Sequence, residues 1–177
     1  MVELSNRPYT IKMTGDVIPS EAELRQYIDL SWCNGVIFNA AVVEHGQRLL
    51  EYDAVLWDDK NVLFIEYKKS VKAYKNLSAK RINQLNSISQ TVARRLGFAN
   101  YQFVIVVSGM NEENERGSVT VVGLPVLEAF KPKFETSKVE LAYIERQIEK
   151  LERTGEKNET LQELYKIREM MIQWEGM

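Results

Sequence analysis

Two carboxylates and a lysine stand in runs of residues that otherwise resemble buried strands. Asp53 lies in LLEYDAVLW, and Glu66 and Lys68 lie in NVLFIEYK. A charge inside an apolar strand is costly unless it is paired or bound to a metal. These residue types therefore indicate either an exposed strand or a site that uses the charges for chemistry.

The two runs predict an antiparallel hairpin with its turn at Asp58–Asn61. A symmetric two- or four-residue loop places Asp53 directly opposite Glu66 and Glu51 opposite Lys68, whereas an odd-length loop would break this alignment. Side chains alternate along a strand, so all four would project from one face. Opposed residues have Cβ atoms roughly 4.5–5.5 Å apart. Two facing carboxylates repel each other and favour a cation between them.

A hard divalent cation suits this pair of acids. Mg²⁺ takes oxygen ligands and usually keeps several waters, so two carboxylates and a backbone carbonyl would form a partial cage. Lys68 beside the metal could orient or help deprotonate a water, or neutralise charge on a phosphate. The plainer interpretation is a solvated strand face, with Glu51 and Lys68 as a surface ion pair of little energetic value.

Charge is distributed unevenly along the chain. Between Lys60 and Asn100 there are nine Lys and Arg residues and one acid, Glu66, for a net charge of +8. The remainder carries 14 basic and 24 acidic residues, for a net charge of −10. Such a basic block is either a footprint for a polyanion or a solvated helix face, and charge alone leaves both open.

The rest of the chain predicts elements that could position such a site. Ser20 and Glu23 form a capping box for a helix that should end near Asn34 and Gly35. The pattern predicts a mixed α/β domain over 1–135 and a helical hairpin appendage over 136–177. Strands are expected at 36–43, 49–57, 61–67, 101–109 and 118–123, and helices from Ser78 to Gly97 and at 125–130, with NEENERG as a polar loop.

These pieces resemble the PD-(D/E)xK nuclease superfamily, also called restriction-endonuclease-like. The matching residues are Glu51-Tyr52-Asp53 and Ile65-Glu66-Tyr67-Lys68, and twelve residues separate Asp53 from Glu66. Tyr52 takes the place of the leading proline of the motif. The element order over 20–123 is similar to the family's α-β-β-β-α-β core, a mixed central sheet flanked by helices. The resemblance implies this fold class for the α/β domain.

The resemblance also implies roles for individual residues. Asp53 and Glu66 would be catalytic metal ligands, the Tyr67 carbonyl a further ligand, and Lys68 the catalytic lysine. The cofactor would be Mg²⁺, with Mn²⁺ as a substitute. The implied reaction is hydrolysis of a phosphodiester by metal-activated water.

Other charged residues would complete the site. Many family members add a carboxylate from the first helix, for which Glu21 and Glu23 are the candidates. Glu21 is favoured because it lies nearer the apolar face of that helix, while Glu23 also fits the capping box. The residues placed to bind phosphates, a sequence-independent contact, are Lys69, Lys72, Lys75, Lys80 and Arg81.

The remaining residues narrow the class of protein. The single cysteine, Cys33, excludes an internal disulfide framework and a Cys-rich zinc site. His45, the single histidine, lies in a predicted turn without a partner Ser or Cys motif. No signal peptide and no apolar stretch of about 18 residues is visible, so a cytoplasmic protein with no membrane partner is expected.

We therefore expect a Mg²⁺-dependent nuclease, with DNA as the favoured partner over RNA. The apolar stripes of the hairpin would suit a homodimer or a larger complex. A second hypothesis is a non-catalytic nuclease-fold module that binds nucleic acid or serves as an interaction subunit. The sequence leaves endonuclease and exonuclease action equally open.

Overall fold

The chain divides into two compact units, Met1–Ser137 and Lys138–Met177. The first is a mixed α/β unit, which contains all the site residues predicted from the sequence, and the second is helical. The structure, a computed structural model, describes residues 3–6, 9–13, 19–44, 46–137, 141–155 and 159–175. Side chains are described for 22–44, 46–137, 145–155 and 159–169.

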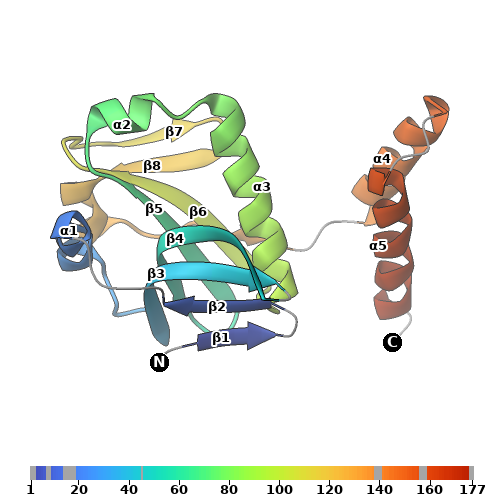
Figure 1. Ribbon diagram of the computed structural model, residues 1–177, viewed down its shortest axis with the longest axis horizontal. Coiled ribbons are helices and arrows are strands. Elements are labelled where there is room, and N and C mark those ends of the chain that lie inside the picture. The colour runs from blue at the N-terminus through green and yellow to red at the C-terminus, as the bar shows by residue number, and fades with distance from the viewer. Residues whose placement is uncertain are drawn as a thin grey trace. The chain divides into compact units, whose positions relative to one another are not determined.

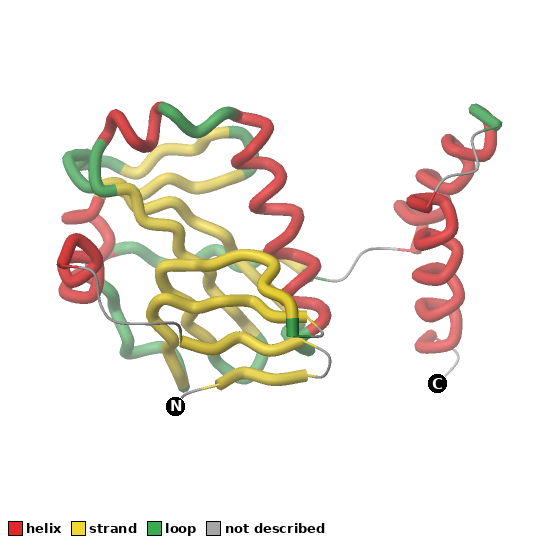
Figure 2. Tube along the Cα trace, viewed as in Figure 1, coloured by secondary structure: helices red, strands yellow, loops and turns green. Residues whose placement is uncertain are grey.

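The described residues of the first unit form nine strands and four helical segments (Figures 1 and 2). The strands are β1 (Glu3–Asn6), β2 (Tyr9–Met13), β3 (Gly35–Glu44), β4 (Gln47–Trp57), β5 (Asn61–Lys68), β6 (Asn100–Val107), β7 (Glu113–Arg116), β8 (Val119–Gly123) and β9 (Glu135–Thr136). The helical segments are α1 (Pro19–Tyr27), α2 (Val71–Lys75), α3 (Ala79–Arg95) and the 3-10 helix η1 (Leu124–Ala129).

The described strands form one mixed sheet. Their order is β1-β2-β3-β4-β5-β6-β8-β7, and β9 pairs with the start of β6. β5 and β6 are parallel, as are β6 and β8, and the other pairs are antiparallel. The carboxyl ends of three parallel strands therefore meet at one end of the sheet, where open α/β sheets commonly bind ligands. Glu66 and Lys68 lie at that end of β5.

Each face of the sheet carries its own apolar core. α3 covers one face through Ile82, Leu85 and Val92, while Leu24 of α1 and Leu127 of η1 cover the other. Figure 1 shows α1 and α3 on opposite sides of the sheet. Alternate side chains of β5 enter the two cores, with Val62 and Phe64 towards α3 and Leu63, Ile65 and Tyr67 towards α1.

Local signals predicted several elements correctly. The five expected strands correspond to β3, β4, β5, β6 and β8. Ser78 caps α3 by accepting the Arg81 N–H at 3.0 Å, and Gly97 follows the helix with φ of +92°. A positive φ is costly for residues with a Cβ, so glycine is suited to this stop.

Other predictions were wrong or incomplete. α1 ends at Tyr27 rather than near Asn34, because the chain turns where the Asp29 carboxylate accepts the Ser31 N–H. NEENERG is not a loop, since Glu113–Arg116 forms β7 at the sheet edge. An edge strand can carry charged side chains, so an apolar pattern does not detect it. β1, β2, α2 and β9 were not predicted either.

The second unit contains α4 (Leu141–Arg153) and α5 (Glu159–Glu175). Ile148 of α4 and Leu161 of α5 are buried together, with Leu151 and Leu164 packed around them. The helical hairpin expected in the tail is therefore present within this unit. Among the helices in the described part of the chain, none is both long and apolar enough to cross a membrane.

Candidate active site

The β4–β5 hairpin has the register that the symmetric loop predicts. The ladder runs from Trp57 opposite Val62 to Ala54 opposite Ile65 and ends there. Asp53 and Glu66 occupy the next positions, just beyond the last paired residues. The two carboxylates therefore lie where β4 and β5 stop exchanging backbone hydrogen bonds.

The alternation of side chains breaks on β3 and β4 at the same cross-strand position. Both Tyr52 and Val55 enter the core under α3, although Ala54 between them enters the opposite core. On β3, Ala40 pairs with Tyr52 and Phe38 with Ala54, which leaves Asn39 facing Asp53. Asn39 has φ of +50°, the left-handed conformation that asparagine tolerates better than most residues.

This break changes which residues share a face. Val62 and Phe64 enter the α3-side core, so alternation places Glu66 and Lys68 on that side of β5. Leu50 and Tyr52 also pack on the α3 side, which turns Glu51 towards the α1 side. Glu51 forms an ion pair with Arg48 at 2.6 Å. The prediction that all four charged residues project from one face is therefore wrong for Glu51.

Asp53 contacts the backbone of β5 through its carboxylate. Its Oδ2 accepts the Tyr67 N–H at 2.6 Å. The neighbouring Lys68 carbonyl accepts the Ser108 N–H of the β6 side at 2.9 Å. Because backbone groups alternate in direction along a strand, the Tyr67 N–H and carbonyl both face the β4 side. The Asp53 carboxylate and the Tyr67 carbonyl are thus directed to the same end of the β4–β5 gap.

Glu66 and Lys68 form an ion pair on β5. Their Oε1 and Nζ atoms are 3.3 Å apart, and the side chains are only 21% and 25% exposed. This pair is less screened by water than a surface ion pair. Lys68 therefore keeps a compensating charge beside Glu66, within the same open end of the sheet.

Tyr52 anchors the strand that carries Asp53. Its buried hydroxyl lies 2.7 Å from Ser89 Oγ, and Ser89 in turn donates to the Leu85 carbonyl at 2.7 Å. Since the single Ser89 proton is used in that bond, Tyr52 is the donor to Ser89. Burial raises the pKa of Tyr52, and the nearby Glu66 carboxylate adds to the effect. Tyr52 thus fastens β4 to α3.

Tyr67 points the other way, towards α1. Its hydroxyl donates to Glu23 Oε2 at 3.4 Å and is also hydrogen-bonded to the Ser108 side chain. Burial raises the pKa of Tyr67, the Ser108 bond opposes this, and the Glu23 and Asp53 carboxylates add to the increase. Of the two first-helix acids, the structure brings Glu23 to the strand end. The Glu21 side chain lies outside the described residues.

The described acids do not form a closed metal cage. Among the side chains that the structure describes, no three His, Cys, Asp or Glu residues converge closely enough to hold a metal ion. Mg²⁺ is commonly held by one or two carboxylates together with substrate phosphates and waters. Asp53, Glu66 and the Tyr67 carbonyl match that donor set in number and type.

The predicted phosphate-binding residues follow directly after β5. Ser70 caps α2 by accepting the Ala73 N–H at 3.0 Å, which places Lys72 and Lys75 one turn apart on this short helix. Arg81 donates to Gln84 Oε1 at 2.9 Å, so this glutamine lies on the exposed start of α3. All the predicted residues are exposed, namely Lys69, Lys72, Lys75, Lys80 and Arg81.

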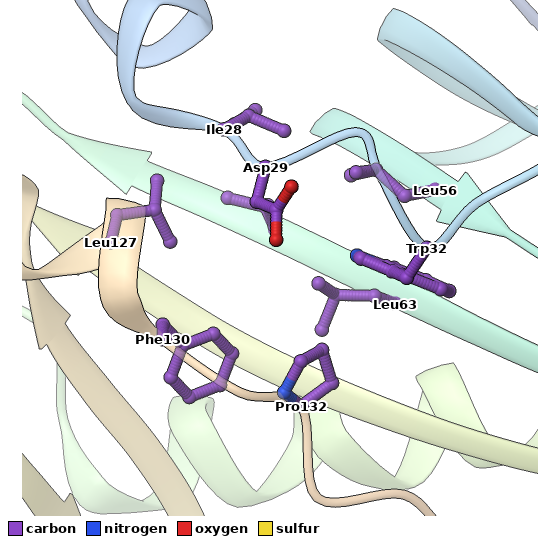
Figure 3. Close-up of a pocket in the computed structure, with 9 residues that line it drawn as sticks. Ile28, Asp29, Trp32, Leu56, Leu63, Leu127, Phe130 and Pro132 are labelled. Atoms are coloured by element: carbon purple, nitrogen blue, oxygen red, sulfur yellow. The ribbon is translucent and has the colours of Figure 1, made fainter.

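Two hollows among the described residues of the first unit lie away from the predicted site residues. One has a volume of about 10 Å³, room for about a single water, and a largely apolar lining that includes Trp32, Leu127 and Phe130 (Figure 3). A polar recess of about 170 Å³ lies near Tyr101 and Gln102, at the other end of β6. Neither of these two hollows is lined by a predicted site residue.

Sequence reasoning missed the residues that hold the site in place. Ser89 lies on the apolar stripe of α3, four residues after Leu85, and a serine on such a stripe is a signal that a buried polar partner exists. Nothing in the sequence marks Ser108 or Asn39 for their positions.

No protein-family model matches the chain, and no curated protein is similar to it in sequence.

Proposed function

We propose that the protein is a metal-dependent nuclease with a restriction-endonuclease-like core, acting on DNA. The observation that carries this proposal is the bond from the Tyr67 N–H to Asp53 Oδ2 at 2.6 Å, beyond the last β4–β5 pair. It holds Asp53 beside Glu66 and Lys68 at the carboxyl end of the parallel strands. A carboxylate replaces the backbone partner there, and a carboxylate also binds cations.

The residues would act as follows. Asp53, Glu66 and the Tyr67 carbonyl would hold Mg²⁺, which when bound activates water and stabilises charge on the phosphate. Lys68 orients the attacking water and neutralises charge that develops on the phosphate oxygens. Its ion pair with Glu66 keeps the ammonium close to that carboxylate.

The basic residues after β5 would hold the nucleic-acid backbone. Lysine and arginine contacts to phosphates are independent of base sequence. They weaken as the salt concentration rises, because the release of counterions on binding then contributes less free energy. Lys72 and Lys75 extend from α2, which begins three residues after Lys68. A polymer could therefore contact the basic surface and the carboxylates at the same time.

A cleavage assay with paired variants tests the proposal. Supercoiled plasmid, linear duplex, single-stranded DNA and RNA would each be incubated with Mg²⁺, Mn²⁺ or EDTA. We expect metal-dependent cleavage that Glu66→Gln and Lys68→Met reduce by about 100-fold or more. The matched controls are Glu51→Gln, an acid of β4 paired with Arg48, and Lys69→Met, the exposed neighbour of Lys68.

The controls separate catalysis from binding. Glu51→Gln should cleave like the natural protein, whereas Lys69→Met should lose affinity and about one unit of the log–log salt slope while keeping turnover. If Lys68→Met and Lys69→Met lose affinity and cleavage rate to the same extent, Lys68 is a phosphate contact like Lys69 and not a catalytic residue. No metal-dependent cleavage of any of the four substrates would refute the nuclease.

One observation favours a second candidate, a non-catalytic nucleic-acid-binding module. Asp53 is hydrogen-bonded to the backbone and Glu66 is paired with Lys68, so protein groups contact both carboxylates without a metal. In that case salt-sensitive binding would persist in EDTA and in Lys68→Met, with no cleavage under any condition.

A further inference from the structure

The edge of β6 that faces β8 is interrupted near the start of the strand. On this edge β9 pairs with Asn100 and Tyr101, and β8 pairs with β6 only from Val104 onward. Among the described strands, none pairs with Gln102 or Phe103 on this edge. The polar recess of about 170 Å³ lies at this gap, because Gln102 and Phe103 both line it.

The backbone N–H of Phe103 is directed into this gap. The Asn100 N–H donates to the Lys60 carbonyl on the β5 side at 3.0 Å, and backbone groups alternate in direction along a strand. Phe103 lies three residues further along, so its N–H faces the other edge, where β8 has not yet begun to pair. Phe103 is only 2% exposed, and a buried N–H requires an acceptor. The recess therefore contains a backbone donor.

Two buried polar side chains also line the recess. Gln102 and Thr120 are only 8% and 7% exposed. The Gln102 amide donates to Thr120 Oγ1 at 3.4 Å and accepts the Lys133 N–H at 2.8 Å. An amide side chain can make about four hydrogen bonds, so part of its capacity remains for a molecule in the recess. This interior favours a ligand that has both donors and acceptors.

Charged side chains of both signs line the same recess. Glu115 of β7, Lys133 and Glu135 of β9 are all exposed. Within the described part of the chain, none of the three forms an ion pair with another. Burial raises the pKa of Tyr101 to about 12, and the nearby Glu135 carboxylate adds to the increase. Two carboxylates and one ammonium thus border the recess without neutralising each other by contact.

The size of the recess limits its ligand to a small molecule. A water molecule occupies roughly 30 Å³ of the liquid, so a ligand that fills about 170 Å³ displaces about five or six waters. This space suits a free amino acid rather than a nucleotide. A ligand that displaces ordered waters loses affinity unless it reproduces their hydrogen bonds, so a largely apolar molecule is disfavoured.

We propose that the recess binds a small zwitterion, a free polar amino acid. The carboxylates of Glu115 and Glu135 attract its ammonium, and the Lys133 ammonium and the Phe103 N–H bind its carboxylate. Its polar side chain uses the remaining hydrogen-bonding capacity of Gln102. An amine alone, a carboxylate alone or a neutral polyol leaves part of this set without a partner. The proposal is independent of the nuclease function, whose residues lie at the other end of the sheet.

The test is calorimetric binding to the full chain with probes that divide the zwitterion into its parts. L-serine and L-glutamine carry both charges, ethanolamine carries only the amine, glycolate only the carboxylate, and glycerol neither. The recess variants are Glu115→Gln, Glu135→Gln and Lys133→Met. The matched controls are Glu113→Gln, on the same strand as Glu115, and Lys131→Met, two residues before Lys133. Both control residues are exposed, and neither lines the recess.

We expect at least one of the two amino acids to bind, and the three partial probes to bind about tenfold more weakly or not at all. Each recess variant should weaken amino-acid binding about tenfold, because a hydrogen bond between charged groups is lost. The two controls should bind like the natural protein.

Three results would overturn the proposal. They are the absence of binding by both amino acids, equal binding of a partial probe, and unchanged amino-acid affinity in the recess variants. The assay contains neither nucleic acid nor metal, so its outcome does not depend on whether the protein is a nuclease.

Discussion

Replacing Asp53 separates its structural contribution from its chemical one. In Asp53→Ala the Tyr67 N–H loses its acceptor at a partly buried position. An unsatisfied buried donor costs about 1–3 kcal/mol, and partial burial places the expected loss in unfolding free energy at about 1–2 kcal/mol. In Asp53→Asn an amide oxygen can still accept that N–H, although without the strength of a charged acceptor.

The neighbouring charge makes the asparagine variant nearly neutral in stability. Loss of the negative charge weakens the bond to Tyr67. It also removes the repulsion between Asp53 and Glu66, which lies opposite it in the register. These effects oppose each other, so we expect the unfolding free energy of Asp53→Asn to lie within about 0.5 kcal/mol of the natural protein. Catalysis should show no such compensation, because an amide is a far poorer ligand for Mg²⁺.

Two assays on the same variants check this reasoning. Urea unfolding would give the stability change from the midpoint at constant slope. Cleavage at saturating Mg²⁺ should fall about 1,000-fold in both variants, since metal stabilisation of a transition state is worth several kcal/mol. If Asp53→Asn loses as much stability as Asp53→Ala, the bond to Tyr67 is not a simple acceptor contact. If Asp53→Asn cleaves normally, Asp53 is structural only.

Two further predictions concern groups outside the candidate site. The guanidinium of Arg25 lies 4.2 Å from the Phe38 ring centroid, but within the described part of the chain its buried Nε and Nη2 atoms have no hydrogen-bond partner. Arg25→Met should therefore raise the urea midpoint, with a gain of about 1 kcal/mol in unfolding free energy. A lower midpoint would show that the ring contact outweighs the cost of the unpaired nitrogens. Burial raises the pKa of Asp58. Hydrogen bonds from the Asn61 side chain and from two backbone N–H groups lower it by more, so the pKa lies below the ordinary 3.8. The carboxylate therefore stabilises the fold at pH values above 3.8 and loses this contribution as the pH falls through its folded pKa. The loss of unfolding free energy in Asp58→Ala should be largest near neutral pH and should shrink in acid. A loss that does not depend on pH would refute this assignment.

The hairpin register was predictable because its causes are local. Asp58 accepts the Lys60 N–H at 2.8 Å and the Asn61 N–H at 2.7 Å, which fixes the four-residue turn. The same turn is closed by the Asp58 N–H, which donates to the Asn61 carbonyl at 2.9 Å. Aspartate and asparagine form such turns from their own side chains, so the sequence around the turn contains the information.

The break in alternation was not predictable in this way. It requires β3, whose Asn39 faces Asp53 from 14 residues upstream, and it depends on how two cores divide the side chains of both strands. Period-two reasoning assumes an uninterrupted pleat and therefore assigned Glu51 to the wrong face. The contact of Tyr67 with Glu23 spans 44 residues and similarly depends on where α1 crosses the sheet.

The position of the break also bears on what Asp53 is for. The backbone carbonyl of Tyr52 would satisfy the Tyr67 N–H equally well if the ladder continued by two more residue pairs, through Asp53 opposite Glu66 to Tyr52 opposite Tyr67. The chain instead ends the ladder, adopts a positive φ at Asn39, and supplies a carboxylate that brings a negative charge close to Glu66. A purely structural role requires none of these costs, because one N–H needs one acceptor, whereas a carboxylate offers about four lone-pair sites. Asp53 thus brings a charge that the bond to the Tyr67 N–H does not require, opposite a second carboxylate, and the proposed metal site would account for that charge.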